Sequence, residues 1–204
     1  MNPNPVMTIG HSTHQLPKFL KLLRQSGVTA VADVRSVPAS RHTPQFNKRA
    51  LEKSLRGEGV KYVFLGEELG ARTRDSSCYV DGRVKYHRLA QTQKFLLGVE
   101  RLERGVRTER IAIMCSEGDP LSCHRTILIA RVLSARNVEI RHIHSDGLVE
   151  THDSAMERLM AKFGLAQEEL FRTSGERLAD ALNRQEREIA YIDEASQVDR
   201  MVDV

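Results

Sequence analysis

The chain has 204 residues, enough for one domain that buries its own core. Hydrophobic residues make up 40% and charged residues 28%, a balance that excludes both a disordered chain and a membrane protein. No run approaches the roughly 18 apolar residues of a membrane span, and the first residues lack the basic start and apolar run of a secretory signal. Three cysteines cannot all pair with one another, so we expect free thiols and a cytoplasmic protein. Because the sequence has no apolar span, we expect no membrane partner.

The net charge of +4 is unevenly distributed along the chain. Residues 1–164 hold 26 Lys and Arg against 17 Asp and Glu, whereas residues 165–204 hold five Arg against ten acidic residues. The basic residues gather in two stretches, which are Arg35, Arg41, Lys48, Arg49, Lys53 and Arg56, and then Arg72, Arg74, Arg83, Lys85 and Arg88. A basic body favours an anionic partner, either a small anionic ligand or a nucleic acid.

Apolar, β-branched runs alternate with stretches of helical spacing along the body of the chain. The first strand is expected at 6–9, and the next helix has Leu16, Phe19 and Leu23 on one face and ends at Gly27. Further strands are expected at 29–34, 60–65, 111–114 and 138–143, further helices at 48–56, 84–104, 126–136 and 152–163, and loops at 35–47 and 66–82. The alternation predicts an α/β fold with three layers, α/β/α, around a mostly parallel sheet of about five strands.

The segment after residue 164 is polar and acidic, with Leu170, Leu178, Leu182 and Ile189 along a sequence of helical composition. We therefore expect a single α/β domain over 1–164 and an acidic helical C-terminal tail over 165–204, disordered from about residue 193. The tail helix either packs back on the body or joins two copies of the chain in a homodimer.

Reactive side chains follow four of the five predicted strands at their carboxyl ends. They are His11 and Ser12 after the first strand, Asp33, Arg35 and the nearby Arg41 after the second, Cys115 and Glu117 after the fourth, and His142 and His144 at the end of the fifth. Open parallel sheets bind ligands at this edge, so we predict the functional site there.

The segment from Cys115 to Arg125 joins a buried strand to a helix and allows three interpretations. In the first, Cys115 is a thiolate nucleophile, with His124 or His11 as the base and the helix start as a cradle for an anion. In the second, Cys115, Cys123 and a histidine bind a metal, zinc or iron. In the third, Cys115 is a buried strand residue, and the helix start binds a substrate phosphate together with Arg125.

The spacing of this segment does not match two known thiolate loops. A tyrosine-phosphatase loop needs an arginine six positions after the cysteine, where this chain has Leu121, and a rhodanese-type loop needs one five positions on, where it has Pro120. All three interpretations therefore stay open. His142 and His144 face the same side of a strand, as a metal pair would, or one of them is a buried, hydrogen-bonded histidine.

These residues resemble the domain-of-unknown-function family 488 (DUF488). The matching motifs are Thr8-Ile-Gly-His11-Ser12, Asp33-Val-Arg35-Ser-Val-Pro38, Ser40-Arg41, Phe46, Leu65-Gly66 with Leu69-Gly70, Met114-Cys115-Ser-Glu117-Gly-Asp-Pro120, Cys123-His124-Arg125, and His142-Ile143 with Asp146-Gly147. They run in order across about the first 150 residues. The resemblance implies a compact α/β protein with its site at these motifs, and it implies no established activity.

We expect an enzyme, a hydrolase or transferase with a cysteine- or metal-assisted site, that acts on a small anionic substrate, phosphorylated or nucleotide-like. The expected catalytic residues are Cys115, Glu117, His11 and Asp33, and the expected substrate-binding residues are Ser12, Arg35, Arg41, Cys123, His124 and Arg125. One alternative is a nucleic-acid-binding accessory protein. The other is a metal-binding sensor or stress protein that holds zinc or iron through Cys115, Cys123, His124, His142 and His144.

Overall fold

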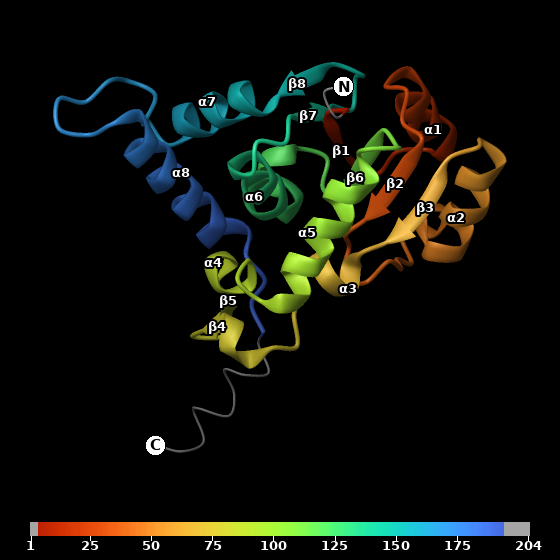
Figure 1. Cartoon of the computed structure of the whole chain (residues 1–204), viewed down its shortest axis with the longest axis horizontal. Helices are drawn as coiled ribbons and strands as arrows, with labels where there is room; N and C mark the ends of the chain where they lie inside the picture. The colour runs from red at the N-terminus through yellow and green to blue at the C-terminus, as the bar shows by residue number, and fades with distance from the viewer. Residues whose placement is uncertain (1–3, 194–204) are drawn as a thin grey trace.

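The computed structural model describes residues 4–193, which form layers around a six-stranded sheet (Figure 1). The strand order is β3-β2-β6-β1-β7-β8. The strands are β1 Val6–Gly10, β2 Ala30–Asp33, β3 Lys61–Phe64, β6 Ile111–Cys115, β7 Ile140–Ile143 and β8 Val149–Thr151. The first five run parallel to one another, and β8 pairs antiparallel with β7. The predicted mostly parallel sheet of about five strands is confirmed, and β8 is a sixth, edge strand that the sequence pattern did not predict.

Side chains of the central strands alternate between two apolar layers, as the period of two in a strand requires. Along β6, Ile111 and Ile113 belong to one core cluster, while Ala112 and Met114 belong to the other. All of these side chains are buried because helices cover both faces of the sheet. The three-layer α/β/α prediction is therefore confirmed.

The helices divide between the two faces. Side chains of α1 Leu16–Gln25 and α2 Lys48–Gly57 pack with the Ala112 face, and those of the later helices pack with the Ile113 face. The later helices are α3 Gly66–Leu69, α4 Tyr86–Leu89, α5 Gln93–Gly105, a π-helix at Arg125–Ala130, α6 Arg131–Ala135, α7 His152–Lys162 and α8 Ser174–Ile189. Within residues 4–193 no helix is both long enough and apolar enough to cross a membrane.

The connections leave the central strands in opposite directions. The chain leaves β1 and β2 toward the face covered by α1 and α2, whereas it leaves β6 toward the other face. In open α/β sheets, such a divergence opens a crevice at the carboxyl ends of the strands. The crevice here lies beside the end of β6, where the motif that begins at Cys115 starts.

The prediction of one continuous helix over 84–104 is wrong in its first half. The segment forms the short helix α4 and then α5, because the Thr92 hydroxyl accepts a hydrogen bond from the Phe95 amide (3.3 Å) and caps the start of α5. The loop expected at 66–82 also carries structure. It contains α3 and the first strand of a hairpin, β4 Tyr79–Val80 with β5 Arg83–Val84. Asp81 and Gly82 form its turn, with φ of 50° and 71°.

The tail helix α8 packs back on the body (Figure 1). Its start is fixed by a capping box between Thr173 and Glu176, and Ala181 and Leu182 are buried in the same core cluster as the sheet. The expected packing of the tail on the body is confirmed for α8, and the expected homodimer stays a prediction. The expected disorder from about residue 193 falls almost wholly outside the described residues.

Candidate functional site

A cavity of about 430 Å³ opens between the segments that follow β2 and β6. Arg35, Ser36 and Ser40 line it from the first segment, and the second segment contributes Cys115, Ser116, Glu117, Ser122, Cys123 and His124. Arg72, Tyr86, Ile189 and Tyr191 complete the wall. The volume lies in the range of pockets that hold metabolite-sized ligands, roughly 300–1,000 Å³.

The loop after β6 lies tightly against the loop after β1. The His11 amide donates to the Cys115 carbonyl (3.0 Å), and the Ser12 amide donates to the Ser116 carbonyl (2.8 Å), so strand pairing continues beyond both strands. A side chain on Gly10 would place its Cβ 1.7 Å from the Glu117 carbonyl oxygen. Glycine is thus required at position 10 for this close approach.

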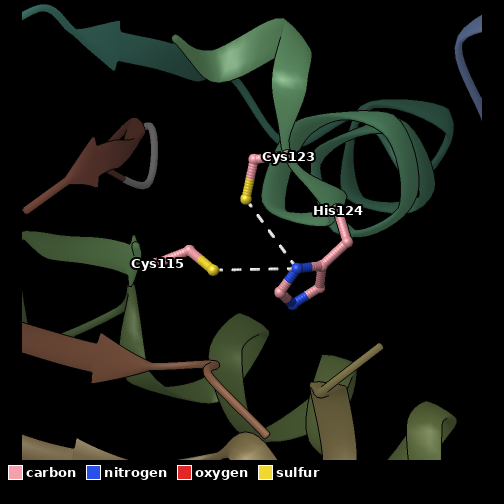
Figure 2. A group of neighbouring side chains, drawn as sticks. All are labelled: Cys115, Cys123 and His124. Atoms are coloured by element: carbon pink, nitrogen blue, oxygen red, sulfur yellow. Dashed lines mark hydrogen bonds between the residues drawn. The ribbon is translucent and has the colours of Figure 1, made fainter. Parts of the chain in front are cut away.

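Three reactive side chains that line the cavity point toward one another (Figure 2). Cys115 lies at the end of β6, while Cys123 and His124 lie just before the π-helix. The His124 Nδ1 atom is 3.7 Å from the Cys115 Sγ and 3.8 Å from the Cys123 Sγ. All three residues are buried. The structure therefore brings together the cysteines and the histidine that both the thiolate and the metal interpretations require.

A backbone contact fixes the orientation of the His124 ring. Its Nε2 atom is 3.2 Å from the Val34 carbonyl oxygen, which accepts only, so Nε2 carries the proton and donates. In the neutral ring, the lone pair of Nδ1 then points at the two thiols. His124 is thereby prepared either to take a proton from a thiol or to bind a cation beside them.

The two thiols differ in acidity. Burial opposes ionisation of Cys123, but the hydrogen bond from Cys115 and the charge of Arg125 bring its pKa well below that of an ordinary thiol. The hydrogen bond to Cys123 and burial raise the pKa of Cys115. Burial opposes the protonation of His124, but the charge of Cys123 outweighs it and raises the histidine pKa. These directions make Cys123 the more acidic thiol of the pair.

The start of the following helix is directed at Cys123. The Arg125 amide donates to the Cys123 Sγ (3.4 Å), and the amides of Thr126 and Ile127 both donate to the Cys123 carbonyl (3.1 Å each). The phosphate-cradle interpretation expected these amides to point at an open anion site. In the structure they donate to Cys123 instead. The helix is a π-helix from Arg125 to Ala130, an uncommon form that is frequent at functional sites.

Arg125, expected to bind substrate, instead holds the loop together. Its side chain is fully buried and is not part of the cavity wall. The guanidinium donates to the carbonyls of Glu117 (2.6 Å) and Gly118 (3.0 Å). Arg125 thus positions the loop and contributes positive charge beneath the thiols.

Asp33, Arg35 and His11 form a buried network behind the cavity. Arg35 Nε and Nη2 donate to the two carboxylate oxygens of Asp33 (2.9 and 2.6 Å), and Tyr62 also donates to Asp33 (2.7 Å). His11 donates through Nδ1 to the Ser12 carbonyl (2.9 Å) and accepts at Nε2 from Arg35 (3.2 Å). Asp33 and His11, expected as catalytic residues, do not line the cavity. Arg35 does line the cavity, but its positive charge is already paired with the Asp33 carboxylate.

Lowering the pH from 7 to 5 is expected to reduce the free energy of unfolding by about 2 kcal/mol through His11 alone. Burial and the Arg35 charge lower the pKa of His11 from 6.5 to about 4. Between these values the unfolded chain binds more protons, so stability present above pH 6.5 is lost as the pH falls toward 4. Urea unfolding at both pH values measures the loss. The His11→Gln variant is expected to lose about 2 kcal/mol less than the wild type, and equal losses would contradict this account of His11.

Glu117 also lines the cavity, near the thiols. The residue as a whole is exposed, but loss of solvent around its carboxyl group and the charge of Cys123 raise the pKa of Glu117. A carboxyl group with a raised pKa beside a thiol is suited to proton transfer near neutral pH.

Four expected site residues lie elsewhere. Ser12 contacts the loop near Gly118, and Arg41 is exposed and outside the cavity wall. His142 accepts from the Thr8 hydroxyl (2.8 Å) and lies 3.2 Å from His152, and burial and His152 lower its pKa to about 3. His144 is paired with Glu150 (2.8 Å). Within residues 4–193 neither histidine belongs to the Cys115–Cys123–His124 group.

Several wall residues were not expected. Arg72 is exposed and lies over the Tyr191 ring (4.8 Å), so α8 and its C-terminal extension form part of the cavity. Tyr86 is buried in the wall, and burial beside Cys123 raises its pKa. The one feature of the sequence that indicated a role for Arg72 was its place in the second basic stretch. Tyr86 and the C-terminal residues Ile189 and Tyr191 were not among the expected site residues.

The comparisons with known proteins support the motif resemblance. The family described as "Domain of unknown function DUF488" matches residues 15–132. This range includes Arg35, Cys115, Cys123 and His124, and the match confirms the family resemblance. No curated protein and no solved structure matches the chain.

Proposed function

Since the chain belongs to the DUF488 family, whose description assigns no activity, we propose a function from the site itself. We propose that the protein is an enzyme that acts on a small anionic substrate, phosphorylated or nucleotide-like, in the cavity at the carboxyl edge of the sheet. The observation that carries the proposal is the convergence of two thiols and an imidazole at the floor of a cavity whose wall holds two arginines.

The anion would be bound chiefly by Arg72. The charge of Arg35 is neutralised by Asp33 at 2.6 Å, whereas Arg72 is exposed at the wall and held by the Tyr191 ring. The backbone of Arg72 is also fixed, because its amide donates to the Ser36 hydroxyl (3.0 Å). Hydroxyl groups at Ser36, Ser40, Ser116 and Ser122 line the same cavity. A guanidinium with several hydroxyls suits a phosphate or a sugar phosphate.

Catalysis would rest on the floor of the cavity. Cys123 is the more acidic thiol, His124 turns its Nδ1 atom toward it, and Glu117 supplies a proton-transfer group at the rim. Arg125 and the Asp33–Arg35 pair act as positioning residues for the two wall segments. Because all three cysteines are free, we place the enzyme in a reducing compartment, the cytoplasm.

A ligand screen tests the proposal. Among phosphorylated metabolites, nucleotides and carboxylates, at least one compound is expected to raise the melting temperature of the protein. Its affinity is expected to fall about tenfold or more in Arg72→Ala, since a charged hydrogen bond contributes roughly 1.5–3 kcal/mol. Arg107→Ala is the matched control, an exposed arginine at the opposite edge of the sheet, before β6. Binding that is unaffected by Arg72→Ala, or equally weakened by Arg107→Ala, would contradict the site.

A second candidate function is nucleic-acid binding, which is favoured by exposed cations on α2. Lys48, Arg49 and Lys53 are all exposed, and Arg41 lies exposed just before this helix. Salt-dependent retention on DNA or RNA is expected, and charge reversal at Arg41, Lys48 and Arg49 should abolish it. Absence of binding even at low salt would remove this candidate.

A further inference from the structure

We infer that Cys115, Cys123 and His124 are three ligands of a zinc ion whose fourth coordination position faces the cavity. The inference deepens the proposed function, because the open position would lie where that function places the substrate. It identifies the chemistry of the cavity floor as that of a Lewis acid with one exchangeable ligand.

The separations between the candidate ligand atoms fit a tetrahedral zinc site. Zn–S bonds of about 2.3 Å and Zn–N bonds of about 2.0–2.1 Å at tetrahedral angles place a sulfur and a nitrogen about 3.6 Å apart. The two S–N separations are 3.7 and 3.8 Å, and all three ligand atoms lie within 4.8 Å of one another. Little movement of the side chains is needed for all three to reach one ion.

The histidine is oriented as zinc ligands usually are. A metal-bound histidine typically donates its other ring N–H to a carboxylate or a backbone carbonyl. His124 has this arrangement, with Nε2 donating to the Val34 carbonyl and Nδ1 facing the sulfurs. The backbone of β2 thus fixes the ring before any ion binds.

The ligand count favours an exchangeable site over a closed one. Within residues 4–193 the group has three members, and no further Cys, His, Asp or Glu belongs to it. All three also line the cavity, so the fourth position is open to a water molecule or a substrate anion. Structural zinc sites use four protein ligands, whereas catalytic sites use three. Two thiolates with one imidazole at tetrahedral spacing suit zinc, which binds sulfur and nitrogen ligands in tetrahedral geometry.

Metal analysis of the full-length, untagged chain purified without chelator tests the inference. One zinc ion per chain is expected in the wild type, and background levels are expected in Cys123→Ser and His124→Gln. Cys78→Ser is the matched control, because Cys78 is also free and buried but lies outside the group. It should keep its zinc. Circular dichroism of each variant checks that loss of zinc does not follow from loss of the fold.

Cobalt substitution of the wild type gives a second measurement that needs no variant. Tetrahedral cobalt with thiolate ligands is expected to show intense visible bands and a sulfur charge-transfer band, and added azide should change them if the fourth position is open. A wild-type chain that stays free of metal after incubation with zinc would overturn the inference. So would a Cys115–Cys123 disulfide, or cobalt bands that azide does not alter.

The proposed enzyme function and the proposed zinc site would be contradicted by different results. A chain without zinc that still binds anions through Arg72 would keep the proposed enzyme and return Cys123 to the role of nucleophile. A zinc-loaded chain with no Arg72-dependent ligand would keep the metal site and remove the proposed substrate class.

Discussion

Replacing Arg125 by Met is expected to lower the free energy of unfolding by about 3–5 kcal/mol. The guanidinium is fully buried and donates to two carbonyls of the loop after β6, at Glu117 and Gly118. A methionine fills much of the same volume but leaves both carbonyls without these charge-assisted hydrogen bonds, each of which contributes about 1.5–3 kcal/mol. The shift in the urea unfolding curve measures the effect.

Arg131→Met is the matched control for this variant. Arg131 lies a few residues further along the same helical segment, but it is exposed. The control is expected to change stability by less than about 0.5 kcal/mol. If Arg125→Met were within about 1 kcal/mol of the wild type, the guanidinium would not be what holds the loop, and the positioning role given to it would be wrong.

Replacing Asp33 by Asn is the second change expected to have a large effect, about 3–5 kcal/mol of stability. Asp33 has no exposed surface and accepts hydrogen bonds from the Arg35 side chain and from Tyr62. The neutral amide would leave the charge of Arg35, which is 4% exposed, buried without a counter-ion. Urea unfolding at pH 7 measures the loss.

Two further variants separate the charge effect from the loss of a hydrogen bond. Tyr62→Phe removes one hydrogen bond to Asp33 and is expected to cost about 1 kcal/mol. The double variant Asp33→Asn/Arg35→Gln removes both charges and should recover part of the loss seen in Asp33→Asn. An Asp33→Asn variant no less stable than Tyr62→Phe would contradict the importance of this ion pair.

The position of the site could be predicted because it follows from topology. The apolar run 111–114 indicated a buried strand, and neighbouring parallel strands bring their carboxyl ends to one edge. The residues that follow β2 and β6 therefore had to meet, and the grouping of Cys115, Cys123 and His124 agrees with that prediction. His142 does not belong to this group, because its strand, β7, lies on the other side of β1 and two positions from β6.

The roles of individual side chains could not be predicted in the same way. Arg125 and Arg35 are both arginines in site motifs, yet one binds backbone carbonyls and the other a buried carboxylate. Residue type does not reveal which partner a guanidinium finds. Arg72 and Tyr191 join the cavity from segments far apart in the chain, and no local pattern signals such a tertiary contact.

A crystal structure of the protein with the tightest-binding compound from the ligand screen tests the proposed site most directly. We expect density for the compound in the cavity after β2 and β6, with its anionic group at Arg72 and its reactive end at the Cys115–Cys123–His124 group. A compound bound away from this cavity, with the three side chains uncovered, would contradict the claim that they form the centre of the active site.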